Sequence, residues 1–355
     1  MGLSDELGRA PANAAAAATG RDTDSPMNRV IRLINGYRFS QAVSIAVRLG
    51  IPDHLAGGSK TADELAELVS VKSGPLYQVL RASASCGVFE EDESGRFSNT
   101  PMSDCLLRDV RGPARILALL LGQIHFAAFD KLIQTVESGE PAFDKAFGLP
   151  FFEYMAQHDE LRRTFDVLMT NLFSVEVDAL MNAYDFPDAG RILDVGGGRG
   201  TVVRALLARF SNLRCGLFDL PVIANRTREE FIRNGMIERC AVETGSFFDS
   251  IPSNYDSYLL KHVLHDWADD DCIRILNNVR RATGHNGRLL ICEYIVPPGN
   301  QPSPVKEMDL LMLSTFAGKE RSKSEFQTLL TKTGFKLDRV ITSTTDLNVL
   351  EAYPT

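Results

Sequence analysis

Cysteine is sparse in this 355-residue chain, and the spacing of its cysteines excludes the usual zinc centres. The six cysteines, at 86, 105, 215, 240, 272 and 292, form no CxxC pair and no other ligand spacing. Several lie inside apolar runs. We therefore expect them to be reduced core residues of a cytoplasmic protein.

Long apolar runs and positive charge are also scarce. No apolar run reaches the roughly 18 residues that span a membrane. The longest, ARILALLLGQIHFAAF, contains Arg115, Gln123 and His125 and predicts a buried helix. The net charge of −8 argues against a general affinity for nucleic acid or anionic membrane, so we expect neither as a partner. The alanine-rich N-terminus lacks a basic and a leucine-rich segment, which favours a disordered tail over residues 1–27.

The length suits two domains, and residues 28–100 carry the pattern of a winged helix. A first helix stops at Gly50 and Pro52, a second starts with a capping box at Thr61, and a third is followed by a short hairpin. A helix that reads DNA needs several basic side chains, but the third helix offers only Arg81. The pattern therefore favours packing or dimerisation over DNA binding.

Residues 101–185 are predicted to be helical, and the pattern changes at about residue 186. From there to residue 355, short β-rich runs alternate with helices, which is typical of a doubly wound, mostly parallel α/β sheet. The last two β-rich runs, 335–343 and 347–354, have no helix between them. We expect these two strands to pair antiparallel at or near one edge of a Rossmann-like sheet.

A glycine-rich turn, ILDVGGGRGTVV, joins the first strand of this region to a helix, the position at which open α/β sheets bind nucleotide-like ligands. Gly196, Gly198 and Gly200 permit positive φ and let a ligand approach the backbone. Asp219 ends the next strand, at a spacing where a carboxylate meets ribose hydroxyls. Thr201 stands where the dinucleotide fingerprint needs glycine, which disfavours a nicotinamide-dependent oxidoreductase, the alternative from another class. The loop and helix N-terminus suit a methionine moiety instead.

Seven motifs in order support a specific resemblance: FFEYM, ILDVGGGRG, FDLP, GSFFDSIP, LLKHVLHDW, GRLLICEYIV and GKERSKSEF. From about residue 28 to its end, the chain resembles the small-molecule S-adenosylmethionine-dependent O-methyltransferases, such as plant caffeate and flavonoid enzymes and bacterial enzymes of polyketides, phenazines and quinones. The resemblance implies a homodimer with a winged-helix dimerisation domain over 28–100, a helical linker and substrate-lining segment over 101–185, and a catalytic domain over 186–355.

The resemblance also assigns a binding site for S-adenosyl-L-methionine. The implied cofactor residues are Gly196, Gly198, Asp219, Ser246, Phe247 and Lys261. Ser246 stands where many relatives have an aspartate, so its contact with adenine would carry no charge. Lys261 alternatively is a strand-end lysine exposed to water.

His265 is the candidate general base. A phenol has a pKa of about 10, so a base of pKa about 6.5 can take its proton during attack on the sulfonium methyl. His265 lies just past a predicted strand, at the edge where such sheets place their sites. Glu293 and Glu320 match the acids that flank the histidine in the family, although Glu320, beside Lys319 and Arg321, alternatively belongs to a solvated charge cluster.

A metal site is the competing interpretation of the same motif. His262 and His265 are three residues apart and are followed by the aspartates 269–271. HxxH is not a standard zinc spacing, however, and acids at 269–271 suit the start of the following helix. We expect no metal and a structural role for His262.

Residues of two helical segments are implied to bind the acceptor, together with Asp266. They are Met169, Phe173, Met312 and Phe316, which could instead form a core stripe. The sequence thus predicts methyl transfer to a hydroxyl of a small aromatic metabolite, in secondary-metabolite biosynthesis. N- or C-methylation of an aromatic metabolite stays an alternative, because an amine needs a base less.

Overall fold

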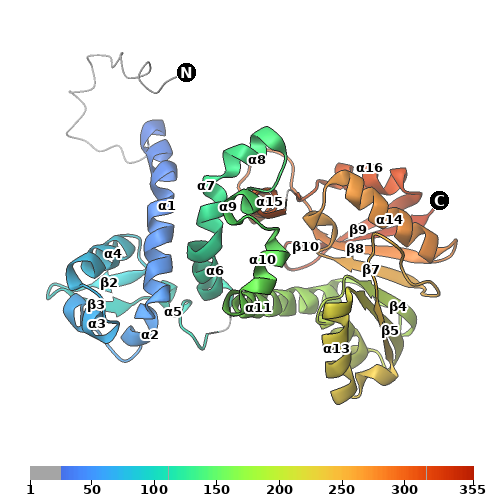
Figure 1. The fold of residues 1–355 in the computed structure, drawn as a ribbon, viewed down its shortest axis with the longest axis horizontal. Helices are drawn as coiled ribbons and strands as arrows, with labels where there is room; N and C mark the ends of the chain where they lie inside the picture. Colours follow the sequence, from blue (N-terminus) through green and yellow to red (C-terminus); the bar gives the residue numbers. More distant parts are fainter. Residues whose placement is uncertain (1–24, 111, 317) are drawn as a thin grey trace, which may run out of the picture. The chain divides into compact units, whose positions relative to one another are not determined.

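The computed structural model describes residues 25–110, 112–316 and 318–355. The chain divides into two compact units, Met1–Val110 and Arg111–Thr355 (Figure 1). Most of the tail predicted over residues 1–27 and the side chain of Phe173 lie outside the described part of the chain, while α1 already begins at Pro26.

The N-terminal unit is a winged helix. It contains α1 (Pro26–Arg48), α2 (Ile51–Leu55), β1 (Lys60–Thr61), α3 (Ala62–Leu68), α4 (Ser73–Ser85), β2 (Phe89–Glu91), β3 (Arg96–Asn99) and α5 (Pro101–Asp104). The three strands pair antiparallel in the order β1-β3-β2. Thr61 caps α3 in a reciprocal capping box with Glu64, as its sequence predicts. Leu65, Leu80 and Phe97 are buried in the core of this unit.

The second unit opens with helices. They are α6 (Ala114–Leu120), a π-helical turn η1 (Leu121–His125), α7 (Phe126–Asp130), α8 (Leu132–Ser138), α9 (Ala142–Phe147), α10 (Phe151–Gln157) and α11 (Asp159–Ala183). Within the described residues, no single helix has the length and hydropathy needed to cross a bilayer. Ala114–Asp130 and Leu132–Ser138 reach those values only when taken together, and they meet at a 47° bend.

A seven-stranded sheet, counted over the described residues, follows these helices in the order β6-β5-β4-β7-β8-β10-β9. The strands are β4 (Ala189–Val195), β5 (Asn212–Asp219), β6 (Cys240–Thr244), β7 (Ser257–Lys261), β8 (Arg288–Tyr294), β9 (Phe335–Thr342) and β10 (Leu347–Pro354). The first five are parallel, whereas β10 runs antiparallel to β8 and to β9. The predicted mostly parallel α/β sheet with an antiparallel edge is confirmed.

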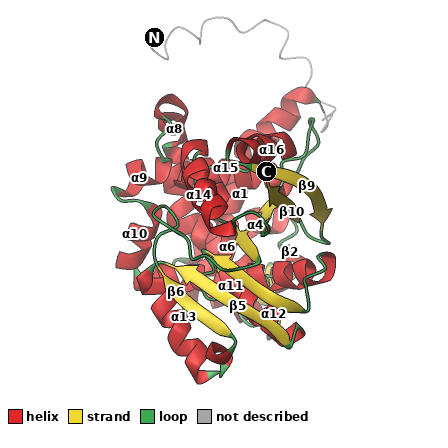
Figure 2. Ribbon diagram, turned by 90° about the vertical axis from the view of Figure 1, so that its right-hand side faces the viewer, coloured by secondary structure: helices red, strands yellow, loops and turns green. Residues whose placement is uncertain are grey.

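Helices cover both faces of this sheet because its strands alternate their buried side chains between two cores. On β8, Leu290 packs toward α11, α12 (Thr201–Arg209) and α13 (Pro221–Arg233), and Ile291 packs toward α14 (Asp269–Thr283) and α16 (Lys323–Lys332). Figures 1 and 2 show α14 and α13 on opposite sides of the strands. Two short helices, η2 (Met236–Glu238) and η3 (Leu264–Asp266), and α15 (Pro304–Phe316) complete the unit.

The cysteine prediction holds only in part. All six cysteines are free, and Cys215, Cys240, Cys272 and Cys292 are buried. Cys86 and Cys105 are exposed, so the expectation of a core position is wrong for these two. Cys86 directly follows α4 and Cys105 directly follows α5, so both thiols lie at helix ends of the N-terminal unit rather than in its core.

Candidate active site

The glycine-rich loop follows β4 at the carboxyl edge of the sheet. Gly196, Gly198 and Gly200 have φ values of 73°, 55° and 72°, in the left-handed region that favours glycine. A Cβ on Gly196 would lie 2.9 Å from a methyl group of Val263. The loop therefore approaches the segment after β7 too closely for a side chain at position 196. Its backbone is held by hydrogen bonds from the Gly196 N–H to the Phe218 carbonyl and from the Gly200 N–H to the Gly197 carbonyl, both at 2.8 Å.

Asp219, at the end of β5, holds this loop in place. Its Oδ2 accepts a hydrogen bond from the Gly198 backbone N–H at 2.8 Å, and its Oδ1 accepts one from Leu220 at 2.7 Å. Burial raises the pKa of Asp219, while the two backbone hydrogen bonds oppose that shift. Because each carboxylate oxygen can accept a further bond, ribose hydroxyls fit this residue.

An aromatic wall stands beside the loop. The Phe247 ring packs edge-on against Trp267 at 6.1 Å between centroids, and Phe248 packs on the same indole at 4.8 Å. The Phe247 carbonyl accepts a hydrogen bond from Asn278 at 2.8 Å. Ser246 is half-buried, and its hydroxyl accepts a bond from the Phe248 backbone N–H at 3.2 Å. A flat apolar ring fits this surface.

Lys261, at the end of β7, contacts a carboxylate that the sequence analysis did not identify. Its ammonium lies 2.6 Å from Oε2 of Glu176 on α11, and both side chains are buried. The same oxygen lies 3.0 Å from Nε2 of His262, and the Tyr294 hydroxyl donates to the other oxygen at 2.5 Å. Burial opposes ionisation of Glu176, but the contacts with His262 and Lys261 hold its pKa well below the usual range.

His265 lies in η3, directly after the end of β7. Its Nδ1 is 2.9 Å from Oε1 of Glu320, and its Nε2 is 3.5 Å from Oδ1 of Asp266. The Glu320 side chain is fully buried, which rules out the alternative of a solvated charge cluster for this residue. The Glu320 backbone N–H donates to Asp309 of α15 at 2.9 Å, so the acid is fixed through its backbone as well.

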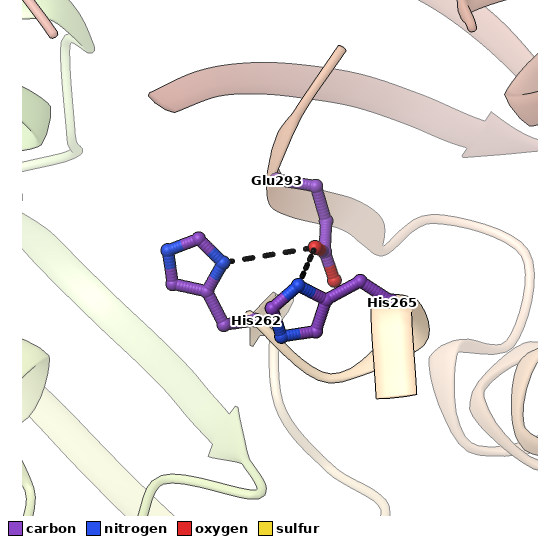
Figure 3. A group of neighbouring side chains, drawn as sticks. All are labelled: His262, His265 and Glu293. Atoms are coloured by element: carbon purple, nitrogen blue, oxygen red, sulfur yellow. Dashed lines mark ion pairs between the residues drawn. The ribbon is translucent and has the colours of Figure 1, made fainter. Parts of the chain in front are cut away.

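Glu293, on β8, supports the histidine in a different way. Its Oε1 accepts hydrogen bonds from the backbone N–H groups of Val263 and Leu264 at 2.9 and 2.8 Å. Its Oε2 lies 3.8 Å from Nδ1 of His262 and 3.9 Å from Nδ1 of His265, beyond hydrogen-bond range. Figure 3 shows both rings around this carboxylate. Glu293 therefore holds the backbone beneath His265 and acts on its ring through charge.

The surrounding acids set the charge of His265. Burial by itself would lower the pKa of His265, but Glu293, Asp266 and Glu320 together raise it to about 10. Burial raises the pKa of Asp266 to about 6 and also raises that of Glu320. Glu293 stays ionised, because His265 offsets its burial and holds its pKa at about 2. The acids around His265 thus favour its protonated form.

The acceptor residues predicted from the sequence cluster in part. Met169 of α11 and Phe316 of α15 both pack on one aromatic core, in which Phe316 contacts Phe151 at 5.2 Å and Phe152 at 5.4 Å between ring centroids. Met312 is buried on the same helix as Phe316. Helix α15 also contacts η3, so this aromatic core adjoins the turn that carries His265.

Three residues of this region escaped the sequence analysis as functional candidates: Glu176, Asp309 and Arg321. Each one contacts a segment far away in the chain, so no local spacing marks it. For Glu176 the available signal was a carboxylate between two valines of a helical segment, in LFSVEVDAL.

Comparison with known proteins agrees with this geometry. A family model described as the O-methyltransferase domain matches residues 129–336, and one described as the O-methyltransferase dimerisation domain matches residues 31–109. The phenazine O-methyltransferase PhzM of Lysobacter antibioticus is 36% identical over 325 residues, covering 92% of this chain and 95% of that protein.

Two further relatives are named for methylation of different atoms, nitrogen in one and oxygen in the other. The 8-amino-8-demethylriboflavin N,N-dimethyltransferase of Streptomyces davaonensis is 31% identical over 327 residues, covering 89% of this chain and 93% of that protein. The structure of NcsB1, an O-methyltransferase of neocarzinostatin biosynthesis in complex with S-adenosylmethionine and 2-hydroxy-5-methyl naphthoic acid, has a TM-score of 0.80 at 29% identity, covering 89% of this chain and 96% of that chain.

The O-methyltransferase model spans more than half of the chain, and the phenazine enzyme is similar over almost its whole length. The glycine loop, Asp219 and the aromatic wall lie at the carboxyl edge of the sheet, within the residues that this model matches. The chain belongs to the S-adenosylmethionine-dependent O-methyltransferases and uses S-adenosylmethionine as its methyl donor.

Proposed function

We propose that this enzyme methylates a hydroxyl group of a small aromatic metabolite, with His265 as the general base and without a metal ion. The observation that carries the proposal is the contact between Nδ1 of His265 and the buried Glu320, at the sheet edge that also carries the glycine loop. The names of the phenazine and naphthoate relatives support secondary-metabolite biosynthesis as the setting.

The Glu320 contact selects the tautomer of His265. An ionised carboxylate only accepts hydrogen bonds, so Nδ1 keeps its proton and Nε2 presents its lone pair when the ring is neutral. As the acceptor oxygen attacks, its proton passes to Nε2, and Glu320 and Glu293 stabilise the imidazolium that results. When bound, the donor supplies a methyl group on a sulfonium, whose sulfur leaves as a neutral thioether.

The raised pKa of His265 has a consequence for the order of events. A histidine with a pKa of about 10 is protonated at neutral pH and cannot accept a proton. A positive charge bound beside the glycine loop would oppose that protonation and lower the pKa of His265. His265 would then release that proton to solvent and be neutral when it meets the acceptor hydroxyl.

A catalytic metal is disfavoured by the existing contacts of the residues that would hold it. His262, His265 and Glu293 offer ligand atoms within 4.8 Å of one another, the arrangement that the HxxH spacing suggested. Nδ1 of His265 is bound to Glu320, and Oε1 of Glu293 accepts two backbone N–H groups. Ligand bonds of about 2.0–2.2 Å would break this arrangement.

The remaining site assignments follow the same geometry. Gly196, Gly198 and Asp219 would hold the methionine and ribose portions of the donor, and Ser246 and Phe247 its adenine. Lys261 would contribute through its charge, since its ammonium is bound to Glu176. The acceptor ring would lie among Met169, Met312, Phe316 and Asp266; a role for Phe173 is proposed from the sequence alone.

An aromatic amine is a second candidate acceptor, because the riboflavin relative is named as an N,N-dimethyltransferase. A neutral aromatic amine already has an available lone pair and loses its proton after attack. The buried His265 and Glu320 pair favours the hydroxyl, which must lose its proton during attack. Matched phenol and aniline versions of one ring would separate the two.

Replacing the proposed base tests the central assignment. We expect His265→Gln to lower kcat toward a phenol by about 10²–10⁴-fold, the usual contribution of a general base, with little change in donor affinity. Turnover followed by mass spectrometry, with calorimetry of donor binding, measures both. Wild-type enzyme dialysed against EDTA should keep its full rate. Near-normal turnover by the variant, or loss of activity with EDTA, would contradict the proposal.

The pH dependence tests the charges around His265. Since only the neutral base is active, kcat/KM for the donor should rise with pH up to the raised pKa of His265. Glu293→Gln keeps a carbonyl oxygen for the backbone bonds but removes a charge that raises this pKa. The rise should therefore move to lower pH, by about 1–3 units. Glu243→Gln is the control. Glu243 lies on β6 and accepts a hydrogen bond from the Tyr255 hydroxyl, so this variant should leave the pH profile unchanged.

Asp219 should control donor affinity rather than the chemical step. Asp219→Asn removes the charge that strengthens its hydrogen bonds, about 1.5–3 kcal/mol each, so we expect a roughly 10–100-fold weaker donor. Calorimetry with S-adenosylhomocysteine measures this without turnover. Asp188→Asn, at an exposed position before the opposite end of β4, is the matched control. Equal affinities for the two variants would refute the ribose assignment.

We further propose a cytoplasmic homodimer that forms through the N-terminal unit. The match to the dimerisation-domain model supports this assembly, and so does an apolar stripe on α1. Val30, Ile34 and Tyr37 along it are 51%, 64% and 56% exposed at helical spacing. The six free thiols support a reducing compartment.

The stripe on α1 gives a test of the assembly. A charge in a buried apolar interface is costly, so Ile34→Glu should convert the dimer into a monomer in sedimentation equilibrium. Leu68→Glu, at an exposed apolar position at the end of α3, should remain dimeric. A wild-type chain that sediments as a monomer, or a dimeric Ile34→Glu, would count against this interface.

A further inference from the structure

Arg321 is fully buried although it stands in the charged sequence GKERSK. A buried guanidinium is costly unless its donors are all satisfied, so its partners indicate what the residue does. The sequence analysis considered it only as part of an exposed cluster with Lys319.

The guanidinium binds the backbone on both sides of His265. Its Nη1 donates to the Leu264 carbonyl at 2.8 Å, and its Nη2 donates to the Trp267 carbonyl at 2.8 Å. Its Nε and Nη2 also donate to Oδ1 of Asp269, in the first turn of α14, at 3.0 and 2.8 Å. Residues 264–267, which we call the histidine turn, thus have both ends tied to one side chain.

The backbone beside Arg321 is tied to the same turn. The Lys319 backbone N–H donates to the His265 carbonyl at 3.0 Å, and the Arg321 carbonyl accepts from Val296, just beyond β8, at 3.0 Å. Glu320, between them, directs its carboxylate to the His265 ring. Consecutive residues therefore hold the ring of His265 and the backbone of its turn.

Gly318, at the start of residues 318–321, packs directly on the backbone of the histidine turn. A Cβ there would overlap the His265 carbonyl oxygen and would lie 2.8 Å from the Asp266 carbonyl carbon. Only a glycine lets the two backbones approach so closely. The position of the histidine turn thus depends on residues 318–321 through backbone contacts as well as through Glu320.

We propose that Arg321 is a positioning residue for methyl transfer. Its guanidinium holds the histidine turn against residues 318–321 and so keeps the His265 ring within hydrogen-bond distance of Glu320. This inference rests on the proposed role of His265. Arginine suits the task because its planar fork reaches two carbonyls and a carboxylate together, which a lysine ammonium on a flexible stem does not reproduce. A displacement of about 1 Å in a catalytic group can cost about 100-fold in rate.

Arg321→Lys keeps the positive charge but loses the fork. We expect kcat to fall about 10–100-fold, while KM and binding of S-adenosylhomocysteine change less than about twofold. Arg280→Lys is the matched control, since Arg280 also donates to backbone carbonyls, those of Gly284 and Gly334 at 2.7 and 3.0 Å, at the far end of α14. Arg280→Lys should keep the wild-type kcat even if it lowers the melting temperature as much as Arg321→Lys does.

A double-mutant cycle separates positioning from general stability. If Arg321 acts through His265, then Arg321→Lys should slow the wild type but should not further slow His265→Gln. Equal losses in both backgrounds, or normal kcat in Arg321→Lys, would overturn the inference. His265→Gln with wild-type turnover would instead overturn the proposed base itself, so the two failures are distinct.

Gly318→Ala moves the same turn without changing any charge. We expect kcat to fall while KM and binding of S-adenosylhomocysteine stay nearly unchanged, as for Arg321→Lys. In the His265→Gln background, Gly318→Ala should cause no further fall in kcat. This variant decides the question if Arg321→Lys does not fold. Normal kcat in a folded Gly318→Ala, or failure of both variants to fold while Arg280→Lys folds normally, would show that these residues serve folding rather than the position of His265.

Discussion

The contact between Nδ1 of His265 and Glu320 is the interaction on which the rest of the active site depends, because it joins two segments 55 residues apart in the sequence. A base held at one ring nitrogen has only the other available for chemistry. The same contact can form only if the backbone of the turn and that of residues 318–321 are themselves fixed. Glu293, Asp309 and Arg321 fix them through hydrogen bonds to or from main-chain groups.

Buried carboxylates crowd around this contact. Among the described residues, Oε2 of Glu293 and Oε2 of Glu320 are buried with no hydrogen-bond partner. Unsatisfied buried acceptors are costly, and they favour positive charge close by. The same acids raise the pKa of His265, so the imidazolium is a positive charge that they favour.

The sequence predicts the parts of this site that follow from short-range pattern. The glycine loop, Asp219 and His265 each lie next to a strand end, so alternation of strands and helices was enough to bring them to one sheet edge. Glu176, Asp309 and Arg321 could not be found this way, because their contacts cross from one element to another. For Glu293, motif and strand position were sufficient to place the residue, but not to show that it binds backbone N–H groups rather than the imidazole. The two exposed cysteines show the same limit, since an apolar run does not say which of its residues face the core.

Lys261 illustrates how burial changes the meaning of a motif residue. The family resemblance implied a contact with the donor, and its position at a strand end suggested exposure to water, yet its ammonium lies on Glu176, which also binds His262 and Tyr294. Asp194, near the end of β4, has its pKa raised to about 7 by burial and by Asp219, and the charge of Lys261 only partly opposes this. The backbone of His262 has a φ of 51°, uncommon for a residue with a side chain, and its ring stacks on that of His265 at 4.9 Å between centroids. Glu176 thus neutralises a buried lysine and, by binding the His262 ring, steadies the sharp turn from β7 into η3. One acid on α11 therefore links the end of β7 to the turn that carries His265.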